Sequence, residues 1–237
     1  MPVTNAHEPS PPIRRVTSYD PRAGRMTPGQ QHAWERSWSR YGRDAADLQP
    51  PLDVAGWFGR TGPLVLEVGS GMGESTAALA TAQPDTLHLA VEMYQPGLAQ
   101  LLMRIEAAGS ENLRLLRGDA VDVLAELIEP GSLAGIRVYF PDPWPKRRHH
   151  KRRLIQPPFV MLAASRLAPT ATLHMATDWV DYAEQMQLVA DAEPLLRGGP
   201  VPRPPWRPMT KFEQRAVHEG REVRDLIYQR GGGPARR

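Results

Sequence analysis

The stretch LVLEVGSGMGEST, Leu64 to Thr76, decides the fold of this 237-residue chain. Its first five residues form a short apolar run that is typical of a buried strand. Gly69, Gly71 and Gly73 follow directly, and a segment with helical spacing comes after them. Glycine permits a tight turn and lets a ligand approach the backbone closely. The stretch therefore predicts a strand, a ligand-binding turn and a helix, in that order.

The same alternation of short β-prone runs and helical segments continues along the chain. It predicts an α/β domain with a mostly parallel sheet and helices on both faces. Further strands are predicted at residues 87–91, 113–116, 136–140 and 171–176, and helices at 74–82, 96–108, 121–128, 158–167 and 179–191. Six prolines between Pro194 and Pro208 predict an irregular loop packed over the domain. A last polar helix is predicted around Arg215 to Gln229.

Length and composition favour one domain over residues 31–230, with a flexible proline-rich leader at 1–30 and a flexible tail at 231–237. The chain has no cysteine, so neither a disulfide framework nor a thiolate metal site is expected. No apolar run approaches the ~20 residues of a membrane span. We expect a cytoplasmic protein, a monomer or homodimer, with no metal and no membrane partner.

Acidic residues stand at three successive strand ends, Glu67, Glu92 and Asp119. Parallel strands direct such residues to one edge of the sheet, where α/β folds bind ligands. A carboxylate beside the glycine turn repels a pyrophosphate but attracts a cation, such as the sulfonium of S-adenosylmethionine. The turn also lacks the third glycine of the dinucleotide fingerprint, which argues against a nicotinamide-dependent oxidoreductase. A helix cap explains any one of these acids, but three together favour a ligand site.

The most informative stretch is PDPWPKRRHHKRRL, Pro141 to Leu154. Its prolines stiffen a loop that carries Asp142 and Trp144 past a strand end. The net charge is only +3, yet basic residues from Lys146 to Arg153 follow with no acid among them. Such a run suits phosphates of a nucleic acid, whereas a solvated charged face normally mixes signs. The histidines within it are adjacent and lack the spacing of a helical metal pair.

The chain resembles the bacterial tRNA (guanine-N7-)-methyltransferases. The residues that carry the resemblance are RAGRMTPGQ (Arg22 to Gln30), EVGSGMG (Glu67 to Gly73), Glu92, Gly118-Asp119, PDPWPKRRHHKRRL, TDW (Thr177 to Trp179) and TKFE (Thr210 to Glu213). The resemblance spans roughly residues 14–230. The proline-tryptophan-lysine block is highly specific, whereas many methyltransferases share the glycine turn.

The resemblance implies a Rossmann-like methyltransferase sheet that ends in an antiparallel strand. It implies methyl transfer from S-adenosylmethionine to the N7 atom of a guanine in the variable loop of tRNA. The cofactor residues it implies are Glu67, Gly69, Gly71, Gly73, Glu92, Asp119 and Asp142, with Asp142 as the catalytic residue. The substrate residues it implies are Lys146, Asp178, Thr210, Lys211, Phe212 and Glu213. The residues expected to meet RNA are Arg147, Arg148, His149, Lys151, Arg152 and Arg153.

Several of these residues have a structural alternative. Asp178 is also placed to cap a helix, and Phe212 to anchor the tail in the core. Thr210 and Glu213 have the spacing of a capping box. Trp144 suits either a stacking surface for a base or a lid over the cofactor. The alternative functions are methylation of another RNA, a small molecule or a protein, and non-catalytic RNA binding on the same fold.

Overall fold

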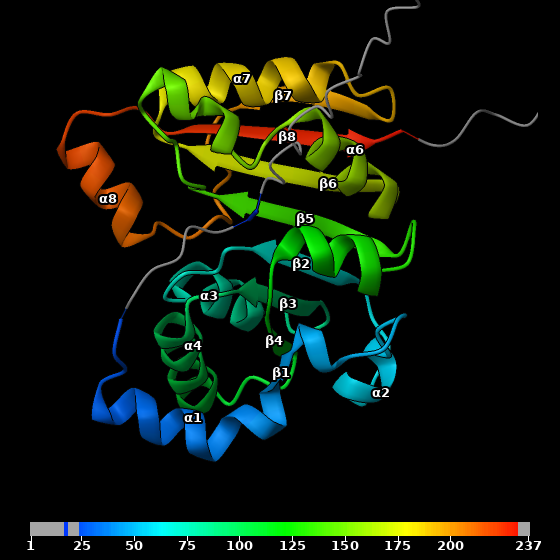
Figure 1. The fold of residues 1–237 in the computed structure, drawn as a ribbon, viewed down its shortest axis with the longest axis vertical. Helices are drawn as coiled ribbons and strands as arrows, with labels where there is room; N and C mark the ends of the chain where they lie inside the picture. The colour runs from blue at the N-terminus through cyan, green and yellow to red at the C-terminus, as the bar shows by residue number, and fades with distance from the viewer. Residues whose placement is uncertain (1–16, 19–23, 232–237) are drawn as a thin grey trace, which may run out of the picture.

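The structure is a computed structural model that describes residues 17–18 and 24–231. Its strands are β1 (Gly42–Asp44), β2 (Leu64–Val68), β3 (Leu87–Glu92), β4 (Leu113–Arg117), β5 (Leu133–Tyr139), β6 (Leu167–Thr177), β7 (Leu196–Val201) and β8 (Arg224–Arg230). In the described part of the chain they form one eight-stranded sheet in the order β1-β4-β3-β2-β5-β6-β8-β7 (Figure 1). Strands β1 to β6 pair in parallel, and β8 runs antiparallel to both β6 and β7. The predicted α/β class with a mostly parallel sheet is confirmed.

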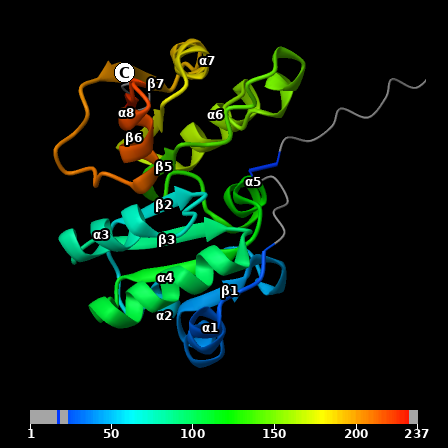
Figure 2. The ribbon, with the colours of Figure 1, turned by 90° about the vertical axis from the view of Figure 1, so that its left-hand side faces the viewer.

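Helices cover both faces of the sheet. They are α1 (Pro28–Tyr41), α2 (Val54–Phe58), α3 (Glu74–Ala82), α4 (Gln95–Ala108), α5 (Ala120–Asp122) continued by a π turn (Val123–Leu127), α6 (Pro157–Arg166), α7 (Val180–Asp191) and α8 (Lys211–His218). Leu64, Leu66 and Val68 of β2 point into the core under α5, α6 and α7. On the other face α1 and α4 lie side by side over Leu113 and Leu115 of β4 (Figure 2). The period of two along each strand thus separates the two cores.

Three sequence predictions need correction at the ends of the chain. The predicted helix at 215–229 is wrong, because α8 ends at His218 and the chain then forms β8. In β8, Leu226 and Tyr228 point into the core while the intervening residues face the other side of the sheet, which is the period of a strand. The predicted loop at 194–208 contains the edge strand β7, where Pro200 is tolerated because edge strands leave amides unpaired.

The predicted leader also extends too far. Helix α1 begins at Pro28, and Thr27 caps it by accepting a hydrogen bond from the Gln30 amide. The Gln30 side chain accepts in return from the Thr27 amide at 2.9 Å, which completes a capping box. Most of the remaining leader and tail, residues 1–16, 19–23 and 232–237, lies outside the described residues.

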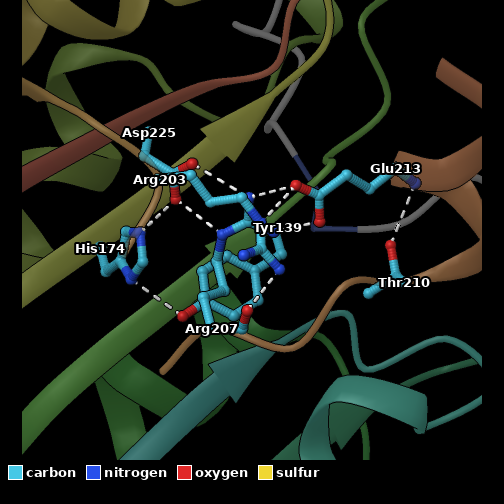
Figure 3. Close-up of polar contacts among 7 residues, drawn as sticks. All are labelled: Tyr139, His174, Arg203, Arg207, Thr210, Glu213 and Asp225. Atoms are coloured by element: carbon cyan, nitrogen blue, oxygen red, sulfur yellow. Dashed lines mark hydrogen bonds and ion pairs between the residues drawn. The ribbon is translucent and has the colours of Figure 1, made fainter. Parts of the chain in front are cut away.

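A buried polar network joins the segment between β7 and α8 to the sheet (Figure 3). Arg207, 1% exposed, donates to both oxygens of Glu213 at 2.8 and 2.7 Å and to Asp225 at 3.0 Å. His174 on β6 lies 2.7 Å from Asp225, and the Tyr139 hydroxyl lies 2.9 Å from the other ring nitrogen of His174. Burial lowers the pKa of His174, so its neutral ring donates to Asp225 and accepts from Tyr139. Ion pairs between buried side chains therefore fix the loop that was predicted to pack over the domain to the sheet.

A second buried polar pair lies on the same face of the sheet, between β3 and β5. Arg137 on β5 lies 3.3 Å from Nδ1 of His88 and donates to Gln83 at 2.9 Å. His88 is 2% exposed. Burial and the Arg137 charge lower the pKa of His88 to about 4, so the native protein holds this ring neutral.

We expect this histidine to make stability depend on pH. Unfolding exposes His88, whose pKa then returns to about 6.5. Between pH 6.5 and 4 the unfolded state therefore binds a proton that the native state excludes. The free energy of unfolding falls by roughly 3 kcal/mol over this range as the pH drops.

Urea denaturation at a series of pH values measures this effect. His88→Gln removes the ionisable ring while keeping a polar group for Arg137, so its stability should depend less steeply on pH. Other groups titrate equally in both proteins, and the difference between the two curves isolates His88. Parallel curves for wild type and variant would contradict the assignment.

Candidate active site at the carboxyl edge of the sheet

A cavity of about 770 Å³ opens at the carboxyl ends of β2, β3 and β5. The glycine turn after β2, the Glu92 end of β3, the loop that begins at Pro141, and residues of α8 line it. Figure 1 shows α8 beyond these strand ends, apart from the helices that cover the sheet. The cavity therefore lies where the convergence of strand ends predicted a ligand site.

The glycine turn has the backbone shape that its composition predicted. Gly69, Gly71 and Gly73 have φ angles of 73°, 55° and 72°, in the left-handed region that favours glycine. A Cβ on Gly69 or Gly71 would meet no atom within 4 Å, whereas one on Gly73 would lie 2.5 Å from Leu101. The first two glycines are thus required by conformation, and the third also by the packing of α3 against α4.

Glu67 is a buried carboxylate at the end of β2. Its side chain lines the cavity, and its Oε2 atom is buried without a hydrogen-bond partner. Burial raises the pKa of Glu67 against the opposing effect of the nearby Arg137 guanidinium. A buried carboxylate with a free oxygen is costly unless a ligand supplies a donor or a positive charge. Glu67 is therefore a candidate contact for a cationic ligand.

Glu92 is held rigidly beside the glycine turn. One of its oxygens accepts from the Gly71 amide at 2.9 Å, and the other accepts from the amides of Met93 and Tyr94 at 2.7 and 2.8 Å. The oxygen that accepts from Gly71 keeps a further lone pair for a ligand hydroxyl. Glu92 lines the cavity as predicted.

Asp119 differs from the other strand-end acids because a leader residue covers it. The Ser18 amide donates to Asp119 at 3.1 Å, and the Ser18 hydroxyl accepts from the Ala120 amide at 2.8 Å. Ser18 lines the cavity, whereas Asp119 does not. Sequence reasoning missed Ser18 because it placed the leader outside the fold. A serine in a proline-rich segment gives no signal that it contacts a residue 101 positions away.

Asp142 lies half-buried in the wall of the cavity, on the proline-rich loop after β5. The loop has a strained backbone, because Phe140 and Trp144 have φ angles of 51° and 47°. Arg153 restrains it by donating to the Pro143 carbonyl at 2.8 Å. Such strain persists where the surrounding structure holds a functional group in place.

Arg153 differs from the rest of the basic run, because the structure buries the side chain that was predicted to meet RNA. Its side chain is 1% exposed, lies over the Tyr182 ring, and donates to Asp181 at 2.6 Å and Gln185 at 2.9 Å. Sequence reasoning could not separate it from its neighbours, because all the arginines of the run have the same charge. Burial against α7 makes Arg153 a structural residue.

The other basic residues lie on a short 3-10 helix, η3 (Arg147–Arg152). Arg147, Arg148 and Lys151 are exposed, as is Lys146 just before them. Arg152 stacks over the Trp144 ring at 4.8 Å. His149 also meets that ring, edge-on at 5.9 Å, so the Trp144 indole is already in contact with two members of the run.

The predicted substrate residues separate into two groups. Asp178, Thr210 and Phe212 line the cavity, whereas Lys146, Lys211 and Glu213 do not. Phe212 is 65% exposed and is therefore not a core aromatic. Lys211 points to Glu74 of α3, with 3.3 Å between Nζ and Oε1.

Glu213 does not reach the cavity. It is 1% exposed and belongs to the Arg207 network, so the structure places its carboxylate away from the site where substrate contact was predicted. The Thr210 hydroxyl accepts from the Glu213 amide at 3.2 Å, so the capping alternative is correct for Thr210 (Figure 3). The Glu213 carboxylate binds Arg203 and Arg207.

Within residues 17–18 and 24–231, no three His, Asp or Glu side chains come together in a way that could hold a metal ion. No helix in the same part of the chain is long and apolar enough to cross a membrane.

Comparison with known proteins gives consistent matches. A family model described as "Putative methyltransferase" matches residues 61–226. A tRNA (guanine-N(7)-)-methyltransferase of Nocardia farcinica is 51% identical over 227 residues, which cover 90% of this chain and 84% of that protein. One of the same name from Bordetella pertussis is 50% identical over 228 residues, 94% of this chain and 89% of that protein.

Among solved structures, a 16S rRNA (adenine(1408)-N(1))-methyltransferase of Catenulisporales acidiphilia with its cosubstrate SAM matches with a TM-score of 0.53. It is 17% identical, and the match covers 78% of this chain and 94% of that one. At this identity the likeness shows the fold alone.

The two kinds of arginine in the basic run should differ in their effect on stability. We expect Arg153→Ala to lower the free energy of unfolding by roughly 2–3 kcal/mol, because it removes a fully buried side chain together with its hydrogen bonds to Pro143, Asp181 and Gln185. Arg148→Ala, at an exposed position of the same run, should change it by less than about 0.5 kcal/mol. Urea denaturation of the two variants beside wild type measures both values. Equal stabilities of the two variants would show that Arg153 faces solvent.

Proposed function

Because the chain belongs to the tRNA (guanine-N(7)-)-methyltransferase family, we propose that it methylates the N7 atom of a guanine in the variable loop of tRNA. The observation that carries the proposal is the cavity at the strand ends, where Glu67, Glu92 and Asp142 converge beside the glycine turn. S-adenosylmethionine is the methyl donor, and tRNA is the substrate.

The cavity fits this donor. The partnerless oxygen of Glu67 is a buried acceptor for a cationic group, and a bound cation would stabilise its charged form. Glu92 suits ribose hydroxyls, and the open space beside Gly69 and Gly71 lets a ligand approach the backbone. The Ser18 amide donates to the Asp119 carboxylate, so a ligand contacts Asp119 only when Ser18 moves away or when both donate to the same carboxylate. When bound, S-adenosylmethionine supplies a methyl group on a positively charged sulfur.

The acceptor atom sets what the protein residues must do. Guanine N7 carries a lone pair in the plane of the ring and no proton at neutral pH, so it attacks the methyl carbon without a general base. The bond to sulfur breaks as the bond to N7 forms, and positive charge moves onto the purine. The N1 and exocyclic amino protons of guanine become stronger hydrogen-bond donors as this happens.

Asp142 and Asp178 are the carboxylates that we assign to the guanine. Both line the cavity, at the ends of β5 and β6. An ionised carboxylate accepts hydrogen bonds and donates none, so each can accept from the N–H groups of guanine. A fixed carboxylate that accepts from the donor edge of guanine binds the charged transition state more tightly than the neutral base. We assign catalysis to Asp142, because its strained loop holds it in place.

The exposed side chains of η3 suit the RNA backbone. Arg147, Arg148 and Lys151 face solvent, next to the loop that carries Asp142. Guanidinium and ammonium groups bind phosphates without regard to sequence, and this binding weakens as salt rises. These residues hold the RNA while the cavity takes the target base.

Nucleoside analysis tests the proposed function. The purified protein is incubated with S-adenosylmethionine and unmodified tRNA, and the RNA is digested and separated. We expect 7-methylguanosine, mapped to the variable loop. We also expect Asp142→Asn to lower the single-turnover rate by about 10²–10³, the usual cost of one preorganised electrostatic group.

Affinity for tRNA serves as the control, because Asp142→Asn should change it much less than the rate. Methylation of another atom, or none with a broad tRNA pool, would refute the proposed reaction. A rate of Asp142→Asn within threefold of wild type would refute only the assignment of Asp142.

A further inference from the structure

Arg221 places a guanidinium in the wall of the same cavity. It follows Gly220, whose φ angle of 73° turns the chain back after α8. The Arg221 amide donates to the Ala216 carbonyl at 2.8 Å, which fixes this turn. Its side chain is 36% exposed and lines the cavity.

Two carboxylates hold Arg221 in this position. Its Nε lies 3.2 Å from Asp178, and its Nη2 lies 2.9 Å from Glu219. Asp178 is the carboxylate assigned above to the donor edge of guanine. That edge, N1–H beside the 2-amino group, is the same N–C–N arrangement that a guanidinium presents. Arg221 thus gives Asp178 a charge partner of the shape that guanine would bring, although the Arg221 Nε atom makes no hydrogen bond.

We propose that Arg221 is a phosphate-binding residue that releases Asp178 to the guanine and pairs with a phosphate next to the target nucleoside. The inference rests on the function proposed above. A nucleotide that enters the cavity carries its own phosphate, and arginine binds phosphate through two parallel hydrogen bonds. One substrate therefore replaces both partners of the Asp178–Arg221 pair.

Because of the neighbouring charges, little free energy is lost when Arg221 leaves Asp178 for a phosphate. The Asp178–Arg221 pair is partly exposed, and such pairs are weak. Glu219 also stays neutralised when Arg221 moves, because Arg215 donates to its other oxygen at 2.8 Å. No carboxylate of this cluster is left without a partner once guanine occupies Asp178.

A purely structural role for Arg221 would affect turnover but not the salt dependence of tRNA binding. If Arg221 only orients Asp178, its loss lowers turnover at saturating tRNA but removes no phosphate contact. The salt dependence of tRNA binding separates the two roles, because each phosphate contact adds about 0.7–0.9 to the slope of log K against log salt concentration.

The experiment measures tRNA binding without methyl donor at several salt concentrations. It uses wild type, Arg221→Ala, Arg221→Lys and the matched control Arg224→Ala. Arg224 is also 36% exposed and also faces an acid, Glu222 at 3.5 Å, but does not line the cavity. Affinity for S-adenosylmethionine is measured on each variant in parallel.

We expect Arg221→Ala to lower the slope by about 0.7–0.9 and to weaken tRNA binding roughly tenfold at low salt. Arg221→Lys should keep the slope and lose part of the affinity. Arg224→Ala should match wild type. Affinity for S-adenosylmethionine should stay within about twofold in all variants, because the proposed contact is with RNA.

An unchanged slope in Arg221→Ala would overturn the proposal, and so would an equal loss of slope in Arg224→Ala. A large loss of S-adenosylmethionine affinity in Arg221→Ala would overturn it too. The test is distinct from that of the proposed function, because binding is measured on unmodified tRNA and no methyl group is transferred. Formation of another methylated nucleoside by wild type would refute the reaction while the slopes still report on Arg221.

Discussion

The site depends on the pairing of Arg207 with Glu213 and Asp225 in the interior. The three side chains are each 1% exposed, and they come from the loop after β7, from α8 and from β8. A buried charge is stable only when it is paired and hydrogen-bonded, so each of the three segments depends on the other two to keep its charge paired. This pairing fixes α8, and with it Thr210 and Phe212, beside the carboxyl ends of the sheet.

The rest of the site follows from two further constraints. Parallel pairing of β2, β3 and β5 brings Glu67, Glu92 and Asp142 to one edge, although they are far apart in sequence. Burial of Arg153 against α7 then restrains the strained loop that carries Asp142. The function proposed above needs a cation-binding acid and a fixed acceptor for the base, and we assign these roles to Glu67 and Asp142 at this edge of the sheet.

Sequence predicted the five central parallel strands and the helices between them, but not α1 or the parallel edge strand β1. The strand ends were predictable because apolar runs followed by acids mark the carboxyl edge of such a sheet. The burial of Arg153 and Glu213 was not, since charge alone does not show which side chain points inward. Strand β8 was missed because its residues are mostly polar and were predicted to continue the helix that ends at His218. Ser18 was missed because nothing in its own segment predicts contact with Asp119.

The most direct test of this account is a double-mutant cycle on Arg207 and Glu213, measured by urea denaturation. The account predicts that Arg207→Met lowers the free energy of unfolding by about 3–5 kcal/mol, because it leaves the buried carboxylates of Glu213 and Asp225 without this guanidinium. Glu213→Gln should lower it by about 2–3 kcal/mol, because Arg207 keeps Asp225 as its only carboxylate in the pair. The double variant should lose little more than one single variant, which gives a coupling energy of roughly 2 kcal/mol or more. Single losses below about 1 kcal/mol, or losses that simply add, would contradict it.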